Sequence, residues 1–598
     1  MTTFQTHPAW SQIEKKDPNR TLVFVGGKAV PMGSVGTWGF EDTSYGRAVH
    51  DPDVMKTLAR REGLPEGDPR LEERVGTRCL ASDHKIATQH AGLVPESIRQ
   101  NVAAYMGLSS KDKMAGRAPL GMQLQALVGS RYLAGLGVTL PTLFQDPRKL
   151  SLLASSGLPG TEKFIESARD TGIQADDKFV DAVRQAVALA RSDTQRTLSE
   201  SEQKALETLE AFAKNPVVGR VPRIDKFGTI QDTMRIAHIL GSGVGTVFAN
   251  MIGPRADDVE GSLLGGARTL GPEFHHTGEC ATFFGSVRAA SLMLLADPQF
   301  FQVPDMVLVG AAEAGFGIPA CRILSLLFDS MGAMEPTDSV LARGANLRTG
   351  YAPLTTDVHG FWPGEGAGMV GLTTAAFAMK HGLRINAELV ALGASADQGG
   401  KTHPAALGKG GLNSLQWVLE VAKRAGIYPD YANLHGTGTR NNNEQEAYSL
   451  AQLQSRVITL FADKAISNHT LGAAGALALS GMLSGILRGV LPGAANIEGR
   501  TIDPEIDQSR FIISSALVTH FFSILLRSQG FWGNNEDQII LPLGEGLLAQ
   551  RLQSVTVGGE IEYWKRVAEN DARGSENIQA INQGHRTYVE SNEQVRLA

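Results

Sequence analysis

Apolar runs and helically spaced apolar residues alternate along most of the chain. Three runs rich in β-branched or aromatic residues are typical of buried strands; they lie at Thr21–Gly26, 305–310 and Ile385–Leu392. In other segments apolar residues recur at helical spacing, over Ser286–Ala296, Leu415–Ala425 and Ala473–Arg488. Strands that alternate with helices predict a layered α/β fold.

Three segments add to this pattern. Between about residues 146 and 215, amphipathic repeats at 179–190 and 206–213 predict a helical insertion. From about Arg551 the sequence is charged around Trp564, which predicts a peripheral helix with a loose polar end. The uncharged stretch Leu471–Leu487 is slightly short for a bilayer span and is followed by Arg488. We therefore expect a buried central helix there and no integral membrane segment.

The composition is that of an ordinary globular protein. The chain has 598 residues, of which 42% are hydrophobic and 20% charged, and its net charge is −6. This small charge does not favour nucleic acid as a partner, although a local basic patch could still receive an acidic carrier protein. Residues 1–20 lack the continuous apolar region of a signal peptide. We expect a cytoplasmic protein.

Cysteine usage supports a reducing compartment. Cys79, Cys280 and Cys321 are too few and too widely spaced for a disulfide framework. His275 and His276 lie close to Cys280, but no second Cys or His cluster completes a metal site, so no metal is expected. We interpret Cys79 and Cys321 as inert buried cysteines.

Two histidines in glycine-rich, largely uncharged segments are the strongest chemical signal. His435 lies in Leu-His-Gly-Thr-Gly-Thr (434–439), and His469 lies between Lys464 and Gly475. With a cysteine such as Cys280, they suggest one active site. A thiolate can hold an acyl group as a thioester, and imidazoles can exchange protons with it near neutral pH.

The motifs occur in a defined order. In residues 360–475 the chain contains Gly364-Glu-Gly-Ala-Gly368, Asp397, Thr402-His-Pro404, Ala425-Gly426, His435-Gly-Thr-Gly-Thr439, Glu446, Lys464 and His469-Thr-Leu-Gly-Ala-Ala-Gly475. Cys280-Ala-Thr lies upstream, and Gly530-Phe531-Trp-Gly-Asn-Asn535 lies near the end. In this order the series resembles the β-ketoacyl synthases, the decarboxylating condensing enzymes of the thiolase fold.

The resemblance implies a fold and a domain organisation. The family has two similar five-stranded halves in a five-layered α/β/α/β/α body, and it is usually a homodimer. We expect an N-terminal segment at 1–20 and a ketosynthase domain at 21–548, with the helical insertion at about 146–215. A charged C-terminal extension would follow at 549–598. Gly241-Ser-Gly-Val-Gly245 lacks the third glycine of a dinucleotide loop; it is interpreted as a glycine turn lining the pocket.

The resemblance also implies roles for individual residues. Cys280 would be the acyl-carrying nucleophile at the start of a buried helix, whose dipole would favour the thiolate. His435 and His469 would donate hydrogen bonds to the malonyl thioester carbonyl and promote loss of carbon dioxide. Lys464 and Glu446 would interact with each other and have an electrostatic, orienting role.

Further positions correspond to substrate-binding residues of the family. Thr437 and Thr439 would bind the pantetheine arm. Phe531 would be a gating aromatic, and its backbone N–H would form an oxyanion hole with that of Cys280. No dissociable cofactor is implied, because the phosphopantetheine belongs to the carrier protein or CoA substrate.

The predicted activity is a decarboxylative Claisen condensation of an acyl thioester, from acyl-CoA or acyl carrier protein, with malonyl carried on acyl carrier protein. A thiolase or initiating synthase would have asparagine in place of His469. A non-catalytic chain-length partner would lack the reactive cysteine. Two pathways remain open: primary fatty-acid synthesis, including its priming by a short acyl-CoA, and a polyketide or aryl-polyene pathway.

Some positions depart from the family pattern, and these departures bear on the substrate. Glu279 precedes the cysteine where a small residue is usual, and Phe283 and Phe284 follow it and could shorten the acyl pocket. Asn468 replaces a glycine, and Asn443 replaces an aspartate.

Overall fold

The computed structural model describes most of the predicted ketosynthase body. The described residues are 13–31, 65, 78–79, 90–91, 94, 120–136, 177–192, 198–214, 236–243, 273–314, 328–344, 351–357, 359–397, 408–451, 459–488, 490–491, 500–506, 516–517 and 523–582. Cys321, Thr402-His-Pro404 and the first part of the predicted insertion lie outside them.

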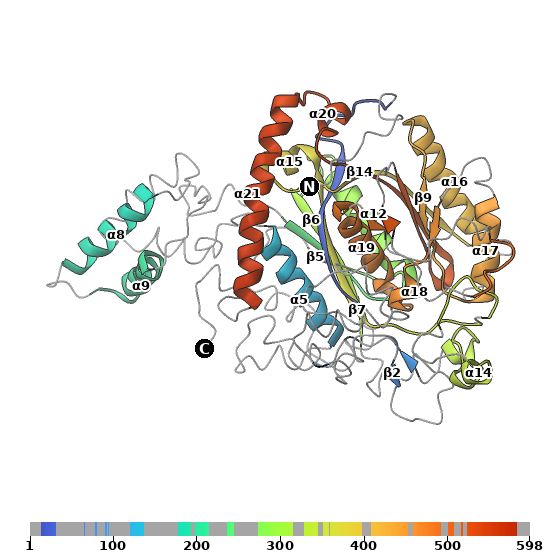
Figure 1. Cartoon of the computed structure of the whole chain (residues 1–598). Helices are drawn as coiled ribbons and strands as arrows, with labels where there is room; N and C mark the ends of the chain where they lie inside the picture. Colours follow the sequence, from blue (N-terminus) through green and yellow to red (C-terminus); the bar gives the residue numbers. More distant parts are fainter. Residues whose placement is uncertain are drawn as a thin grey trace.

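The centre of the protein is a ten-stranded sheet in the order β10-β9-β13-β14-β8-β1-β7-β6-β4-β5 (Figure 1). Its strands, in chain order, are β1 (Leu22–Pro31), β4 (Ile236–Gly241), β5 (Glu273–His276), β6 (Met306–Glu313), β7 (Gly366–Thr374), β8 (Ala387–Ala396), β9 (Tyr431–Asn433), β10 (Thr459–Phe461), β13 (Ile524–Gln529) and β14 (Asn534–Pro542). Two short hairpins, β2 (Arg78–Cys79) with β3 (His90–Ala91) and β11 (Val490–Leu491) with β12 (Ala516–Leu517), lie outside it.

The sheet consists of two halves with the same pairing pattern. In the first half β5, β4 and β6 are parallel, β7 is antiparallel to β6, and β1 is antiparallel to β7. In the second half β10, β9 and β13 are parallel, β14 is antiparallel to β13, and β8 is antiparallel to β14. The halves meet where Val23 and Phe24 of β1 pair with Glu388 and Ala387 of β8. This repetition confirms the predicted duplicated architecture.

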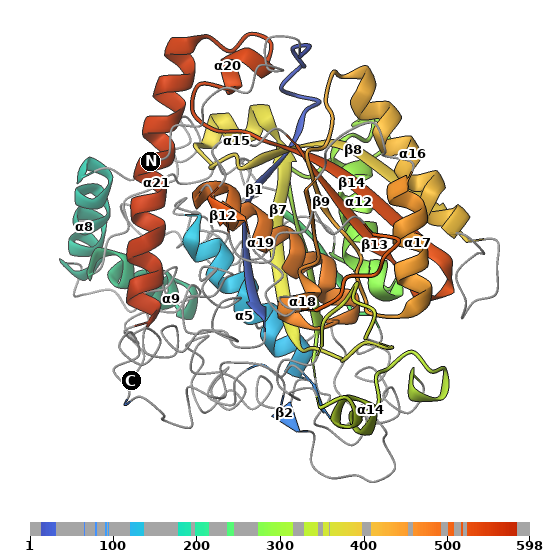
Figure 2. The same cartoon turned by 45° about the vertical axis from the view of Figure 1, so that its right-hand side comes forward.

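Helices complete the five layers. The central layer contains α12 (Thr282–Leu294) and α19 (Ala474–Arg488), which contact each other and strands of both halves (Figure 2). The outer face of the first half is covered by α5 (Leu120–Gly135), and that of the second by α16 (Lys409–Arg424), which contacts α17 (Arg440–Ala451). The apolar stretch predicted as a buried helix is therefore α19. Among the described helices, none is both long and apolar enough to cross a membrane.

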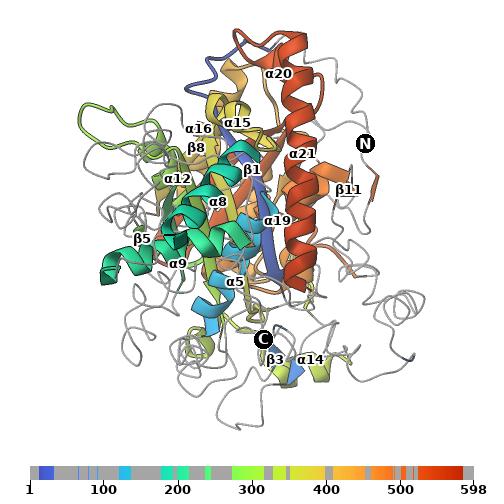
Figure 3. The same ribbon diagram turned by 90° about the vertical axis from the view of Figure 1, so that its left-hand side faces the viewer.

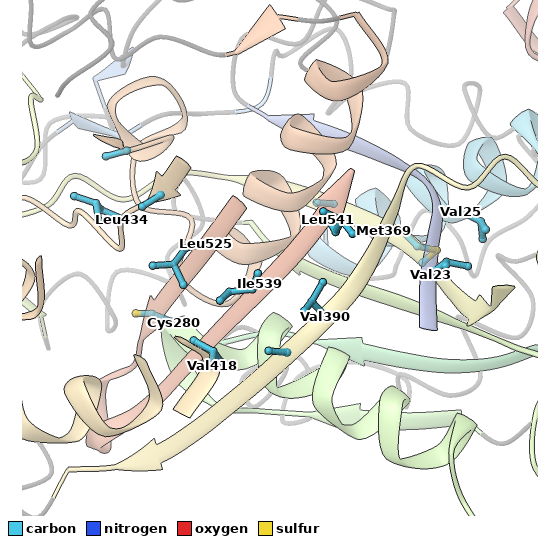
Figure 4. Close-up of a cluster of buried hydrophobic side chains, with 14 of the residues drawn as sticks. Val23, Val25, Cys280, Met369, Val390, Val418, Leu434, Leu525, Ile539 and Leu541 are labelled. Carbon is cyan, nitrogen blue, oxygen red and sulfur yellow. The ribbon is translucent and has the colours of Figure 1, made fainter. Parts of the chain in front are cut away.

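Side chains on both faces of the sheet are buried, which explains the nearly continuous apolar strands. Because successive side chains of a strand point to opposite faces, Val23 and Val25 of β1 join one core cluster, and Leu22 and Phe24 join the other. Figure 4 shows part of the first cluster, to which Leu525 of β13, Ile539 of β14, Val390 of β8 and Cys280 all belong. The core thus extends up to the predicted nucleophile.

Smaller helices connect these layers: α14 (Thr337–Ala342), α15 (Ala375–His381), α18 (Lys464–Ser467) and α20 (Leu548–Arg551). Part of the predicted insertion forms α8 (Asp177–Ser192) and α9 (Glu200–Lys214), which pack against each other. Figure 1 shows this pair set apart from the sheet. Helical structure in the insertion is thereby confirmed for residues 177–192 and 200–214.

The predicted C-terminal helix is α21 (Val557–Asn582), which runs alongside α5 (Figure 3). Buried side chains of α21 form hydrogen bonds with the rest of the protein, so this helix is not the loosely attached peripheral helix that the sequence predicts. The Tyr563 hydroxyl donates to the carbonyl of Leu383 (2.6 Å) and accepts from the N–H of Ile385 (2.9 Å). Glu560 accepts from backbone N–H groups at the start of α20, including that of Ala549 (2.9 Å), where a carboxylate also complements the helix dipole.

At the last residue of α20, a buried ion pair fixes this C-terminal region to the sheet. Arg551 donates from Nε and Nη2 to the two carboxylate oxygens of Glu388 (2.6 and 2.8 Å), and both side chains are fully buried. Lys16 also donates to Glu388 (3.1 Å). One carboxylate of β8 therefore holds both the N-terminal segment and α20.

Without Arg551, the buried carboxylate of Glu388 keeps the partly exposed Lys16 as its partner. We expect Arg551→Met to lower the free energy of unfolding by about 3–5 kcal/mol. Arg551→Met combined with Glu388→Gln should lose less, because no buried charge is left unpaired and Lys16 can face solvent. Urea denaturation measures both. Arg424→Met, which removes an exposed pair with Glu420, is the control and should cost less than about 1 kcal/mol. Equal losses for the single and double variants would contradict this account.

Candidate active site

Cys280 lies in a sharp turn between β5 and α12. It belongs to a 3-10 turn, Glu279–Ala281, that leads directly into α12, and its side chain is buried. The Thr282 hydroxyl accepts from the Gly278 N–H (2.8 Å) and donates to the Glu279 carbonyl (2.7 Å). The Ser528 hydroxyl of β13 donates to the Cys280 carbonyl (2.8 Å). The predicted position at the start of a buried helix is confirmed.

His469 reaches Cys280 from the equivalent connection of the other half. β10 is followed by α18, His469, a 3-10 turn (Leu471–Ala473) and α19. Its Nε2 lies 3.0 Å from Cys280 Sγ. Its backbone N–H donates to the Trp362 carbonyl (2.9 Å), and its carbonyl accepts from the Gly364 N–H (2.9 Å). Each half of the sheet therefore contributes one member of the pair.

Asn468 stands before His469 where the family usually has glycine. Its φ of +57° and ψ of −173° lie in a backbone region that is essentially restricted to glycine. The turn into His469 is therefore a strained position for asparagine. The other departure, Asn443, is buried in α17 and donates to Asp503 (3.3 Å).

His435 follows β9 and completes the group. Its ring lies 5.7 Å from the His469 ring, centre to centre, at nearly a right angle. The His435 N–H donates to Glu446 Oε1 (2.7 Å), and the His435 carbonyl accepts from Lys464 Nζ (2.5 Å). The main chain of His435 is thus held from both sides.

The predicted interaction between Glu446 and Lys464 is indirect. The carboxylate of Glu446 forms its ion pair with Arg527 (2.6 Å). Lys464 instead donates to the carbonyl oxygen of His435. Arg527 is not among the site residues predicted from the sequence. The available signal was an arginine inside the apolar strand β13, where a buried charge requires a partner.

Burial controls the protonation of both histidines. It lowers the pKa of His435 and of His469 well below 6.5, and the nearby positive charge of Lys464 lowers each further. Burial also lowers the pKa of Lys464, although Asp463, Cys280 and Glu446 oppose that shift. At neutral pH both imidazoles are therefore uncharged, and each can donate one hydrogen bond and accept another.

One cavity brings together most of the predicted site. Cys280, His435 and His469 line it, as do the substrate-binding candidates Thr437, Thr439 and Phe531. The two threonine hydroxyls lie 3.2 Å apart. Lys464 and Glu446 act on the main chain of His435 from outside this lining. The lining also includes polar side chains that the sequence analysis did not select: Asn441, Asn442, Gln445 and Gln529.

Phe531 closes the cavity on the side of β13 and β14. Its ring lies 5.3 Å from that of Phe328, and its backbone N–H faces the sulfur of Cys280 and lowers the thiol pKa. By contrast, the rings of Phe283 and Phe284 are buried in a core cluster with Leu479 of α19. They are not among the residues that line this cavity.

The glycine turn after β4 lies behind the site. Gly243 N–H donates to Glu313 (2.8 Å), and a Cβ on Gly472 would lie 2.1 Å from Gly243 N. The turn therefore allows the loop that follows His469 to approach closely. Val244 and Gly245 lie outside the described residues. Within the described part of the chain, no group of three His, Cys, Asp or Glu side chains could hold a metal ion.

The Cys280 thiol is not acidic, although it lies at the start of a helix. Burial raises the pKa of the Cys280 thiol to about 12, and the charge of Glu279 adds to this shift. Lys464 and the Phe531 N–H lower it by less. The pKa of Glu279 is itself raised to about 7, by burial and by Glu313. The resting pair is therefore a thiol beside a neutral imidazole.

We expect Glu279→Gln to lower the pKa of the Cys280 thiol. At about pH 8, Glu279 is mostly ionised, and the variant should react with iodoacetamide roughly fivefold faster than the wild type. At about pH 6, Glu279 is mostly protonated, so the two rates should converge. Glu560→Gln, a buried carboxylate far from the thiol in sequence, is the control. Equal rates for Glu279→Gln and the wild type at about pH 8 would refute the assignment.

Comparisons with known proteins match part of this sequence. The family profile "Beta-ketoacyl synthase, C-terminal domain" matches residues 386–498. The 3-oxoacyl-(acyl-carrier-protein) synthase 2 of Rhizobium meliloti is 28% identical over 276 residues, which cover 45% of this chain and 61% of the relative. A 3-oxoacyl-(acyl-carrier-protein) synthase homolog of Saccharomyces cerevisiae is 29% identical over 192 residues, covering 31% and 43%. The match thus spans less than two thirds of either relative.

The fold extends the similarity over nearly the whole chain. The crystal structure of the ketosynthase FabY from P. aeruginosa superposes with a TM-score of 0.63 at 15% sequence identity, covering 94% of this chain and 92% of that one. At this identity the likeness concerns the fold. The matched family domain contains His435 and His469. Residues 386–498 thus match the C-terminal domain of the β-ketoacyl synthases, and the chain as a whole has the fold of a solved ketosynthase.

Proposed function

We propose that the protein is a 3-oxoacyl-acyl-carrier-protein synthase that works through an acyl-Cys280 intermediate. The observation that carries the proposal is the 3.0 Å contact between Cys280 Sγ and His469 Nε2, in a cavity that His435 also lines. The substrates are an acyl thioester, on CoA or acyl carrier protein, and malonyl-acyl carrier protein. No cofactor of the protein itself takes part, since the phosphopantetheine arrives with the substrate.

In the first half-reaction Cys280 becomes acylated. His469 Nε2 accepts the thiol proton as Sγ attacks the acyl carbonyl carbon. The N–H groups of Cys280 and Phe531 stabilise the oxyanion. The departing CoA or carrier thiolate takes up the proton, and the acyl group remains on sulfur. A neutral His469 suits this role, because its Nε2 can accept a proton without first losing one.

In the second half-reaction the histidines act as donors. Malonyl thioester binds with its arm along Thr437 and Thr439, and its carbonyl oxygen accepts hydrogen bonds from His435 and His469. Loss of carbon dioxide leaves an electron pair on the enolate, which these donors stabilise. The enolate carbon attacks the acyl carbonyl, and Cys280 leaves as a thiolate that regains a proton. The product is a 3-oxoacyl thioester two carbons longer.

His469 must accept in one half-reaction and donate in the other. Nδ1 of His469 and Nδ1 of His435 have no hydrogen-bond partner within the described part of the protein. A partner at Nδ1 commonly fixes which nitrogen carries the proton. Without one, His469 can change tautomer between the two half-reactions. This freedom supports the two roles assigned to one ring.

The pathway and assembly are proposed on the same basis. We place the enzyme in fatty-acid synthesis, with a secondary-metabolite ketosynthase as the alternative of the same chemistry. Acyl carrier protein is its expected partner in the cytoplasm. A homodimer is proposed from the family resemblance, and exposed apolar side chains such as Phe274 of β5 and Phe300 after α12 are compatible with it. Sedimentation velocity distinguishes the dimer from a monomer.

Intact-protein mass spectrometry tests the nucleophile. After incubation with acyl-CoAs of graded length, the wild type should gain one acyl mass on Cys280, and Cys280→Ala should gain none. The longest acyl group that loads gives the chain-length preference. Acylation of Cys280→Ala would overturn the nucleophile assignment. Failure of the wild type to accept any acyl group would instead favour a non-catalytic partner subunit.

The donor role of the histidines has a separate readout. Because the enolate loses a donor, His435→Ala should slow release of carbon dioxide from malonyl-acyl carrier protein by about 10²–10³-fold. Acylation of Cys280 should change much less, since His435 does not contact the sulfur. Isotope-labelled malonyl substrate measures the first rate and mass spectrometry the second. Equal losses in both half-reactions would contradict the separate role.

A further inference from the structure

A buried arginine outside the cavity is connected to the loop that carries His435. The side chain of Arg527 in β13 is 1% exposed. Its Nη1 donates to Glu446 Oε2 (2.6 Å), and its Nε donates to Asp537 Oδ1 (2.8 Å). Its Nη2 lies 3.3 Å from the Gly411 carbonyl and 3.4 Å from the Ser449 hydroxyl. All three guanidinium nitrogens are engaged, so the group has one defined orientation.

Glu446 uses its two carboxylate oxygens for different partners. Oε2 binds Arg527, and Oε1 accepts the backbone N–H of His435 (2.7 Å). Lys464 binds the carbonyl of the same residue. The Nδ1 atom of the His435 ring has no partner among the described residues, so the two backbone hydrogen bonds orient His435. Arg527 fixes the position of Glu446 in that arrangement.

The charges around Glu446 depend on Arg527. Burial raises the pKa of Glu446, and the charge of Asp537 adds to this shift. Arg527 opposes it most strongly, followed by the His435 N–H and Lys464. Without Arg527, two buried carboxylates would face each other with less positive charge nearby, and protonation of one would be favoured. A protonated Glu446 is a weaker acceptor for the His435 N–H.

We propose that Arg527 is a positioning residue for His435, which it holds in place by orienting an ionised Glu446 against the His435 backbone. The proposal rests on the proposed condensing activity. It assigns Arg527 to the decarboxylation half-reaction, where His435 acts, and leaves acylation of Cys280 largely independent of it.

Replacement of Arg527 should therefore separate the two half-reactions. In Arg527→Met, release of carbon dioxide from malonyl-acyl carrier protein should fall by about 10²-fold or more, and the rate of Cys280 acylation by less than about threefold. Arg527→Lys retains the charge but not the planar fork, so it should recover part of the lost rate. Addition of Glu446→Gln to Arg527→Met should cause little further loss, because both changes interrupt the same connection.

The pH dependence of carbon dioxide release gives a second test. If Arg527 had only a structural role, its replacement would not shift this pH profile. Loss of Arg527 raises the pKa of Glu446, and decarboxylation requires its ionised form. The acidic limb of the rate profile should therefore shift to higher pH in Arg527→Met. It should disappear in the double variant with Glu446→Gln, which has no carboxyl group to titrate at that position.

Arg551→Met provides a matched control. Arg551 is as buried as Arg527 and is paired with Glu388, but it has no contact with the cavity. It should lower stability without changing the ratio of the two half-reactions. Circular dichroism identifies any unfolded variant, and if Arg527→Met does not fold, Arg527→Lys supplies the comparison.

Three outcomes separate the possibilities. If the wild type neither accepts an acyl group nor releases carbon dioxide, the proposed function fails. If the wild type does both and the folded Arg527 variants slow both steps equally, the positioning role fails. An unshifted acidic limb in Arg527→Met would also overturn it.

Discussion

The contact between Cys280 and His469 depends on the relative position of the two halves of the sheet. The thiol follows β5 in one half, and the imidazole follows β10 in the other. Neither half can form the pair alone. The central helices α12 and α19, the junction of β1 with β8, and the close approach of Gly472 to Gly243 together bring the two loops to hydrogen-bond distance.

Burial has opposite consequences for the two kinds of reactive group. It keeps both histidines neutral, which allows them to donate and accept hydrogen bonds at neutral pH. The same burial makes the Cys280 thiol less acidic, despite its place at the start of a helix. Desolvation is the largest influence on the thiol pKa, so the proton must be removed locally. His469, the basic group in contact with the sulfur, is suited to this task.

The sequence predicts the fold and the central residues of the site because both leave local signals. The apolar runs predict β1, β6 and β8, whose observed bounds begin within two residues of the expected ones. Glycine-rich segments around His435 and His469 identify the reactive loops. Arg527 leaves a weaker signal, because its meaning depends on a tertiary contact with Glu446, which is 81 residues away. The high thiol pKa likewise results from tertiary burial, which a local helix argument does not include.

The most direct test of the account is a single-turnover reaction of preformed acyl-Cys280 enzyme with malonyl-acyl carrier protein. Mass spectrometry follows the protein and the carrier, while released carbon dioxide is collected. We expect each acyl group that leaves Cys280 to yield one carbon dioxide and one 3-oxoacyl carrier protein extended by two carbons. If the acyl group stays on Cys280, or is lost to water without an extended product, the protein is not the condensing enzyme described above.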